Sequence, residues 1–364
     1  MKLGVVGLPN VGKSTLFNAI TKAGAEMANY PFCTIEPNVG IAPVPDDRLD
    51  VLTKMYNAKS TVPATVEFVD IAGLVKGASK GEGLGNKFLS HIREVDAILH
   101  VVRCFENEKI IHVANKIDPV NDVETINFEL IFSDMEQVDK KIEKCLKLIK
   151  AGDKNAEAEL SCLQKIKLTL EGGKPANQTD FTKEEKEMIK GFFLLTTKPI
   201  IYVANISEND LYKNENEIPL LEQLKKYVGE TAEIIPISAK IEDEMNSLSP
   251  EDKKIFLADM NLKESGLDKL IKASYKTLGL ISFLTAGEKE VRAWTIKNGS
   301  KAPQAAGVIH TDFEKGFIKA EIVDYNELIK AGSFVKAKEL GKVRIEGKDY
   351  TVKDGDVILF RFNV

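Results

Sequence analysis

The chain has 364 residues, a length that predicts two or three domains at ~100–200 residues per domain. Its hydrophobic content of 43%, charged content of 29% and net charge of −5 indicate a globular protein without a surface that coats nucleic acid. No apolar stretch approaches ~18 residues and a strand starts at the N-terminus, so we expect no membrane span, no signal peptide and a cytoplasmic location. The cysteines lie far apart, which predicts free thiols rather than disulfides or zinc: Cys33, Cys104, Cys145 and Cys162.

The first predicted elements are a strand over 3–6 and a helix over 15–20, and the residues between them read G-L-P-N-V-G-K-S. This is the phosphate-binding loop pattern in its usual strand–loop–helix context. Gly7 and Gly12 let backbone N–H groups face phosphates, and Lys13 reaches the β- and γ-phosphates. Ser14 offers its hydroxyl to Mg²⁺. The pattern predicts a nucleoside triphosphatase whose loop binds the nucleotide through Asn10, Val11, Gly12, Lys13, Ser14 and Thr15.

The next motif follows an apolar run over 66–69, where Asp70-Ile71-Ala72-Gly73 matches D-x-x-G. We expect Asp70 to hold Mg²⁺ through water and the Gly73 N–H to bond the γ-phosphate. Thr34, in the segment between the two motifs, is placed to close onto Mg²⁺ as a first switch. The glycine-rich stretch 77–86 resembles a second switch. Leu74 stands where many GTPases have the water-positioning Gln, so another group must orient the water.

Two segments compete for recognition of the base. Asn115-Lys116-Ile117-Asp118 reads N-K-x-D, the guanine signature, but it follows the strand over 97–103 too closely to fit the next helix and parallel strand. The strand over 199–205 ends in N-I-S-E, which leaves Lys116 and Asp118 as solvated loop residues. An amide suits the N1 acceptor of adenine and a carboxylate suits guanine, so this element favours ATP over GTP. The predicted base-side residues are Asn205, Ile206, Glu208, Ser238, Ala239 and Lys240.

The 135 residues between Asp70 and Asn205 exceed what a nucleotide domain needs and predict an insertion. Apolar residues alternate at spacings of three and four from Phe128 to Ile149, the seam of a coiled coil. After a turn at 151–155, a return helix over 156–170 follows, with Lys167 interrupting its seam. Beyond 281, short alternating runs predict the strands of a small α+β unit. That segment carries 14 Lys or Arg residues against 12 Asp or Glu, a weak hint of a polyanionic partner.

These residues together resemble the YchF family of Obg-like ATPases over essentially the whole chain. Long matching stretches carry the resemblance: 29–37, 70–79, 102–107 and 289–294. The resemblance implies a preference for ATP, a K⁺ ion at Asn10 and association with the large ribosomal subunit or the 70S ribosome. It also implies a catalytic role for His112, which the residue pattern alone would not single out. The C-terminal unit resembles a TGS domain, a β-grasp module for which RNA contact is implied.

We therefore expect an α/β P-loop NTPase domain with an inserted antiparallel helical hairpin and a C-terminal TGS-like β-grasp domain. The expected boundaries are 1–127 and 199–280 for the nucleotide domain, 128–198 for the insertion and 281–364 for the C-terminal domain. The favoured function is Mg²⁺-dependent ATP hydrolysis as a switch on the ribosome. Arg103 and Lys76 are weaker catalytic candidates, more typical of surface or structural residues. Two alternatives stay open, a GTPase that binds RNA and a nucleotide-stabilised binding module without turnover.

Overall fold

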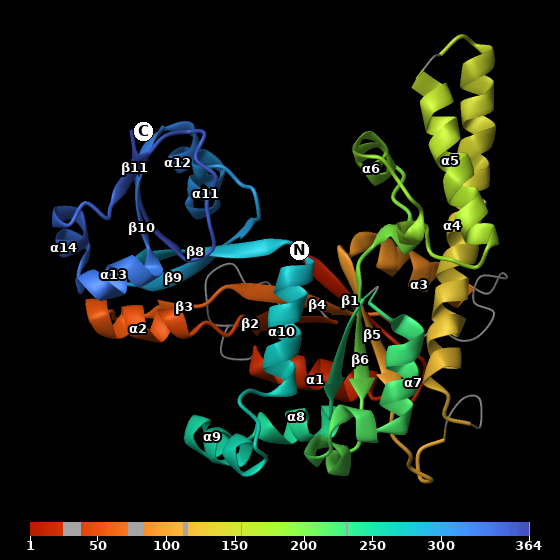
Figure 1. The fold of residues 1–364 in the computed structure, drawn as a ribbon, viewed down its shortest axis with the longest axis horizontal. Helices are drawn as coiled ribbons and strands as arrows, with labels where there is room; N and C mark the ends of the chain where they lie inside the picture. Colours follow the sequence, from red (N-terminus) through yellow and green to blue (C-terminus); the bar gives the residue numbers. More distant parts are fainter. Residues whose placement is uncertain (25–37, 72–82, 112–115, 154, 231, 364) are drawn as a thin grey trace. The chain divides into compact units, whose positions relative to one another are not determined.

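The structure is a computed structural model that describes residues 1–24, 38–71, 83–111, 116–153, 155–230 and 232–363. Its internal contacts divide the chain into two compact units (Figure 1). The first unit comprises Met1–Gly40 and Glu67–Lys269, and the second comprises Ile41–Val66 and Leu270–Val364. The second unit therefore takes residues 41–66 from between the two phosphate-site motifs. Among the described residues, no helix is both long enough and apolar enough to cross a membrane.

The first unit is built on a six-stranded sheet with the order β2-β4-β1-β5-β6-β7. The pairings of β4 with β1, β1 with β5, β5 with β6 and β6 with β7 are all parallel. Every residue of β5 is buried, as expected where helices cover both faces of a parallel sheet. The strands are β1 (Lys2–Val6), β2 (Val39–Pro43), β4 (Thr65–Asp70), β5 (Ala97–Arg103), β6 (Ile200–Asn205) and β7 (Glu233–Ile237).

Helices α4 and α7 pack against this sheet through a shared apolar cluster that includes Val102, Val123, Ala204 and Leu221. Elsewhere in the unit α1 and α8 contact each other. The helices are α1 (Lys13–Ala23), α3 (Gly83–Glu94), α4 (Pro119–Lys150), α5 (Asn155–Glu171), α6 (Lys183–Lys190), α7 (Pro219–Val228), α8 (Ala239–Met245) and α9 (Pro250–Asp259). Helix α10 (Gly266–Thr277) begins in this unit and continues into the second. Short 3₁₀ helices also occur: η3 (Ala176–Gln178), η4 (Leu195–Thr197), η5 (Glu208–Tyr212) and η6 (Glu215–Glu217).

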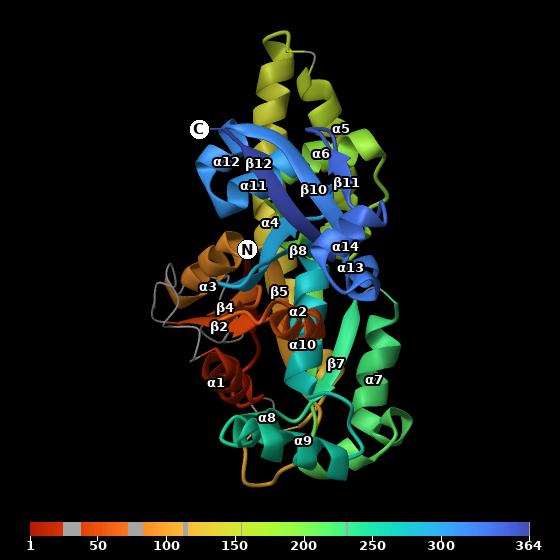
Figure 2. The ribbon, with the colours of Figure 1, turned by 90° about the vertical axis from the view of Figure 1, so that its left-hand side faces the viewer.

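The expected helical hairpin is present, with α4 and α5 side by side (Figures 1 and 2). Its core contains Ile131, Val138, Cys145 and Leu163, which belong to the predicted seams. Two details differ from the prediction. Phe128 is 45% exposed rather than buried in the seam. Ile166 fills the core of α5, so the neighbouring lysine, which was expected to interrupt the seam, instead forms an ion pair on the surface: Lys167 Nζ with Asp139 Oδ1 at 2.7 Å.

The second unit contains a mixed six-stranded sheet with the order β11-β10-β12-β8-β9-β3. Alanines of α11, with α12 beside it, pack on phenylalanines of this sheet (Figure 2). The strands are β3 (Thr61–Val62), β8 (Leu280–Ala286), β9 (Val291–Lys297), β10 (Phe317–Asp324), β11 (Arg344–Glu346) and β12 (Asp356–Phe362). The helices are α2 (Asp47–Tyr56), α11 (Ala302–Ile309), α12 (Thr311–Lys315), α13 (Tyr325–Ala331) and α14 (Phe334–Glu339).

Residues 41–66 are integrated into the second unit by backbone and side-chain contacts. β3 pairs in parallel with β9, opposite Val291 and Arg292. The guanidinium of Arg48 on α2 bonds Asp46 and reaches Asp354 at 2.8 Å between Nη1 and Oδ2. These hydrogen bonds to carboxylates raise the pKa of Arg48. The guanidinium group of Arg48 therefore links two parts of the sequence that lie about 300 residues apart.

Candidate nucleotide-binding site

The loop from Gly7 to Ser14 joins β1 to α1 and adopts a backbone that requires glycine. Gly12 has a φ of +95°, and a Cβ atom there would lie 2.1 Å from Nδ2 of Asn205. A Cβ atom on Gly7 would lie 2.8 Å from the carbonyl oxygen of Val101 on β5. The helix begins at Lys13, so its N-terminal N–H groups are those of the loop itself. This arrangement of free N–H groups and a helix N-terminus binds phosphate.

Lys13 and Asp70 meet in front of this loop. Parallel pairing places Asp70, the last residue of β4, opposite Val5 of β1, which directly precedes the loop. The ammonium group of Lys13 contacts the Asp70 carboxylate, and both side chains are largely shielded from solvent. Ser14, the next residue in the chain after Lys13, is exposed. Mg²⁺ prefers oxygen ligands and often takes only one or two of them from the protein when phosphates supply others. The Ser14 hydroxyl and the Asp70 carboxylate are ligands of this kind, so these residues fit that ion.

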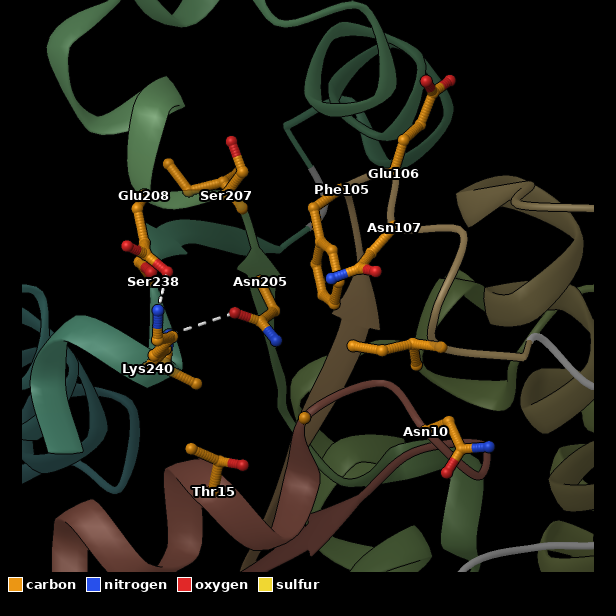
Figure 3. A pocket seen from close by; sticks show the side chains of 14 residues that line it. Asn10, Thr15, Phe105, Glu106, Asn107, Asn205, Ser207, Glu208, Ser238 and Lys240 are labelled. Carbon is orange, nitrogen blue, oxygen red and sulfur yellow. Dashed lines mark hydrogen bonds and ion pairs between the residues drawn. The ribbon is translucent and has the colours of Figure 1, made fainter.

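A cavity of about 430 Å³ lies next to the loop (Figure 3). Four separate parts of the first unit line it, namely the phosphate loop, the turn after β5, the loop after β6 and the loop after β7. These loops follow the carboxyl ends of neighbouring parallel strands, where α/β folds bind their ligands. The lining residues are Asn10, Gly12, Thr15, Phe105, Glu106, Asn107, Ile110, Asn205, Ile206, Ser207, Glu208, Ser238, Ala239 and Lys240.

Asn205, at the end of β6, holds two of these parts together. Its amide nitrogen donates to the carbonyl oxygen of Val11 at 2.8 Å, and its amide oxygen accepts from the Ala239 N–H at 3.1 Å. The side chain is buried, with 6% of the residue exposed. We expected Asn205 to read the base, yet one of its donors and its acceptor are engaged with the protein backbone. Its position in the cavity thus fixes the phosphate loop against the base-side loops.

The far side of the cavity presents a charged pair. The ammonium group of Lys240 contacts the carboxylate of Glu208, and both side chains remain partly exposed (Figure 3). Ser238 is buried beside them, and Ile206 is 4% exposed. Phe105 faces this group from the opposite side (Figure 3). The cavity therefore combines an apolar ring, a donor and an acceptor, which is what a purine base requires.

The structure brings together the phosphate-loop and base-side residues that the sequence predicts. Thr34, Gly73 and His112 lie outside the described residues. Within the N-K-x-D segment, Lys116 and Asp118 do not line the cavity. Asp118 is not a simple loop residue, because its carboxylate caps α4 by accepting from the Asn121 N–H at 3.2 Å.

Sequence reasoning missed the turn after β5 as part of the cavity, with Phe105, Glu106, Asn107 and Ile110. The stretch 102–107 carried the family resemblance, which was the available signal. His100 is a core histidine on β5. It is 1% exposed, its ring centroid lies 5.4 Å from that of Tyr202, and burial lowers its pKa to about 3.

A strand, a glycine loop that starts a helix, and an aspartate at the end of the adjacent parallel strand define a P-loop nucleotide-binding domain. Residues 2–134 match the family model described as "50S ribosome-binding GTPase". Residues 280–363 match the model of the C-terminal domain of YchF proteins, described as a protein of unknown function.

Curated relatives match the chain over its whole length. "Ribosome-binding ATPase YchF" of Bacillus subtilis (strain 168) is 60% identical over 365 residues, covering 99% of each chain. The protein of the same name in Escherichia coli O157:H7 is 52% identical, covering 100% of this chain and 99% of the relative. The solved Schizosaccharomyces pombe YchF GTPase superposes with a TM-score of 0.89 at 41% identity, covering 99% of this chain and 97% of the other. The chain belongs to the YchF family.

Proposed function

We propose that this chain is a P-loop ATPase that acts as a nucleotide-dependent switch and binds the ribosome. One observation carries the nucleotide part, the cavity in which the phosphate loop, Asn205 and the Glu208–Lys240 pair meet. The names of the curated bacterial relatives supply the ribosome part. Large ribosomal subunits and 70S particles are the binding partners to test, and contact of the C-terminal unit with RNA is the mode that its TGS-like sequence favours.

The Glu208–Lys240 pair supports adenine over guanine. The Watson–Crick edge of adenine offers one acceptor, N1, and one donor group, N6–H₂. A carboxylate next to an ammonium group presents the complementary acceptor and donor. The corresponding edge of guanine offers one acceptor, O6, and two adjacent donors, N1–H and N2–H₂, and these two donors match the two oxygens of an unpaired carboxylate. Because Lys240 pairs with Oε1 of Glu208, a guanine that bonds both carboxylate oxygens through its two donors would have to displace Lys240.

In the proposed reaction the chain contributes positioning and charge. The loop N–H groups and Lys13 hold the β- and γ-phosphates and stabilise the charge that develops on them. Ser14 and Asp70 would hold Mg²⁺, which neutralises phosphate charge when bound. Thr34 and Gly73 would sense the γ-phosphate, and His112 would orient the attacking water. Asn10 donates its amide nitrogen to the Ile111 carbonyl oxygen at 3.0 Å, and its amide oxygen is the ligand that we assign to K⁺.

Phosphate release from ATP tests the enzyme. We expect turnover by the wild type and none by Lys13→Ala, since removal of the ammonium group leaves the transferred phosphoryl group without its nearest protein charge. Equal turnover in both would contradict the proposal.

Co-sedimentation with purified 50S and 70S particles, in ATP and in ADP, tests the switch. We expect association that depends on the nucleotide, and no association at low salt would contradict ribosome binding.

A GTPase is the second candidate, because the matching family model and the yeast structure are both described as GTPases. Guanine would have to be accepted by the paired Glu208. A direct comparison of ATP with GTP separates the two candidates.

A further inference from the structure

Arg103, the last residue of β5, is the largest fully buried side chain in the described part of the protein, with 0% of the residue exposed. It lies beside the nucleotide cavity but is not among the residues that line it. Burial of a charged side chain is costly unless its hydrogen bonds are satisfied and its charge is compensated. A fully buried arginine next to a binding cavity therefore calls for a structural or functional explanation.

The guanidinium group donates three hydrogen bonds to backbone carbonyl oxygens of one turn. Nε donates to the carbonyl oxygen of Phe105 at 3.2 Å, Nη2 to that of Asn107 at 3.1 Å and Nη1 to that of Ile110 at 3.0 Å. Its central carbon also lies 4.6 Å from the centre of the Phe105 ring. The planar fork of arginine allows these bonds in one geometry, which the single ammonium group of lysine cannot reproduce.

The charge of Arg103 is balanced from α4. Asp122, a buried residue of α4, attracts the guanidinium group electrostatically. This attraction opposes the lowering of the Arg103 pKa by burial. An arginine side chain stays protonated in proteins, so the bonds of Arg103 to the three carbonyl oxygens are charge-assisted, which makes them stronger than neutral ones.

The turn that Arg103 holds is also a wall of the nucleotide cavity. Phe105, Asn107 and Ile110, whose carbonyl oxygens it binds, all line that cavity. Just beyond them, the Ile111 carbonyl oxygen accepts from the Asn10 amide of the phosphate loop at 3.0 Å. The turn is thus fixed at one end by a buried charge and at the other by the phosphate loop.

We propose that Arg103 is a positioning residue for nucleotide binding, which holds residues 105–111 in the shape that places Phe105 and Asn107 against the base. The inference rests on the proposed nucleotide-binding function and deepens it. A turn already ordered before the nucleotide arrives avoids the entropic cost of ordering it on binding. Phe105 and Asn107 lie across the cavity from Glu208 and Lys240 (Figure 3). Because these are the residues that we assign to the base, which ATP and ADP share, we expect the same effect on both nucleotides.

Equilibrium binding of fluorescent ATP and ADP analogues to the wild type, Arg103→Lys and Arg103→Met tests the inference. In each variant we expect the Kd for ATP and the Kd for ADP to rise at least tenfold, and we expect the two Kd values to rise by the same factor. Asp134→Asn is the matched control, because Asp134 is also a fully buried charged group that accepts from the backbone N–H groups of Leu195 and Thr196, at the hairpin. The control should lower the melting temperature and leave both Kd values within twofold of the wild type.

The outcomes separate this inference from the proposed function. Wild-type protein that binds neither nucleotide would overturn both. Wild-type binding that persists within twofold in folded Arg103→Lys and Arg103→Met would overturn the role of Arg103 alone. If Asp134→Asn lost as much affinity as the Arg103 variants, the effect of Arg103 would be one of general stability. That result would also overturn the inference. Should Arg103→Met not fold, Arg103→Lys decides, because it keeps the charge opposite Asp122 and most of the buried volume.

Discussion

The side chain of Asn205 occupies the space that a side chain on Gly12 would need. Its amide nitrogen donates to Val11 at 2.8 Å, and a Cβ atom on Gly12 would lie 2.1 Å from that nitrogen. The strand that ends in the base-side motif is thereby fastened to the phosphate loop across 194 residues of sequence. A glycine at position 12 is required both by its positive φ and by this close approach.

Gly12→Ala should therefore abolish tight nucleotide binding. The new methyl group must displace Asn205, which breaks its bond to Val11 and disturbs its bond to Ala239. We expect the Kd for ATP to rise at least 100-fold and the free energy of unfolding to fall by about 1–3 kcal/mol. Titration with a fluorescent ATP analogue measures the first and chemical denaturation the second. Gly152→Ala is the control, with a φ of +92° and no atom within 4 Å of the new Cβ. Equal affinities in the two variants would refute the steric argument.

Lys240→Ala should shift the base preference from adenine towards guanine. The substitution removes the ammonium group from the Glu208 carboxylate, which can then accept from both donors of guanine. We expect the ratio of the GTP Kd to the ATP Kd to fall at least tenfold, or by about 1.4 kcal/mol of relative binding free energy. Lys22→Ala, which removes another exposed ion pair of the same unit, serves as the control. An unchanged ratio in Lys240→Ala would remove this pair from base recognition.

Asp70→Asn should raise the requirement for Mg²⁺. The amide keeps the size of the side chain but loses the negative charge that faces Lys13 and that we assign to the ion. We expect the Mg²⁺ concentration for half-maximal ATP turnover to increase at least tenfold, and chelation of Mg²⁺ to stop turnover in the wild type. Steady-state phosphate release at a series of Mg²⁺ concentrations gives the result. Identical Mg²⁺ curves would place the metal elsewhere.

His100 should make the first unit less stable in mild acid. Its pKa in the folded protein is about 3, against an ordinary value of 6.5, because burial disfavours the charged ring. Below pH 6.5 His100 therefore becomes protonated in the unfolded chain but stays neutral in the folded protein. Stability from this group is full above pH 6.5 and is lost as the pH falls towards 3. Between pH 6.5 and 5 the loss is about 2 kcal/mol.

The His100→Leu variant tests this pH dependence. Its free energy of unfolding should fall less than that of the wild type over the same pH range, by about the amount that His100 contributes. Denaturant unfolding at closely spaced pH values provides both curves. Parallel curves for the two proteins would show that His100 does not titrate between the folded and unfolded states in this range.

The nucleotide domain could be predicted in detail because its signals are local. β1, β4, β5, β6 and β7 are short, largely apolar runs that lead into the residues of the site, as is typical of strands in a buried parallel sheet. The rejection of residues 115–118 as base readers likewise came from the spacing of strands. Thr34, Gly73 and His112 stay predictions.

The parts that sequence reasoning missed depend on partners far away in the chain. β3 has only two residues, and its pairing partner β9 lies about 230 residues later, so no local pattern marks residues 41–66 as part of the second unit. Arg103 gave the sequence signal of a surface or structural residue. Its acceptors are backbone carbonyl oxygens, which leave no trace in side-chain identity.

Side-by-side equilibrium binding of fluorescent ATP and GTP analogues, with Mg²⁺ and K⁺ present, tests the central claim most directly. The cavity with its paired Glu208 and Lys240 predicts that ATP binds at least tenfold more tightly than GTP, a difference of about 1.4 kcal/mol. Equal or tighter binding of GTP would contradict the account and would return attention to residues 115–118 as readers of the base.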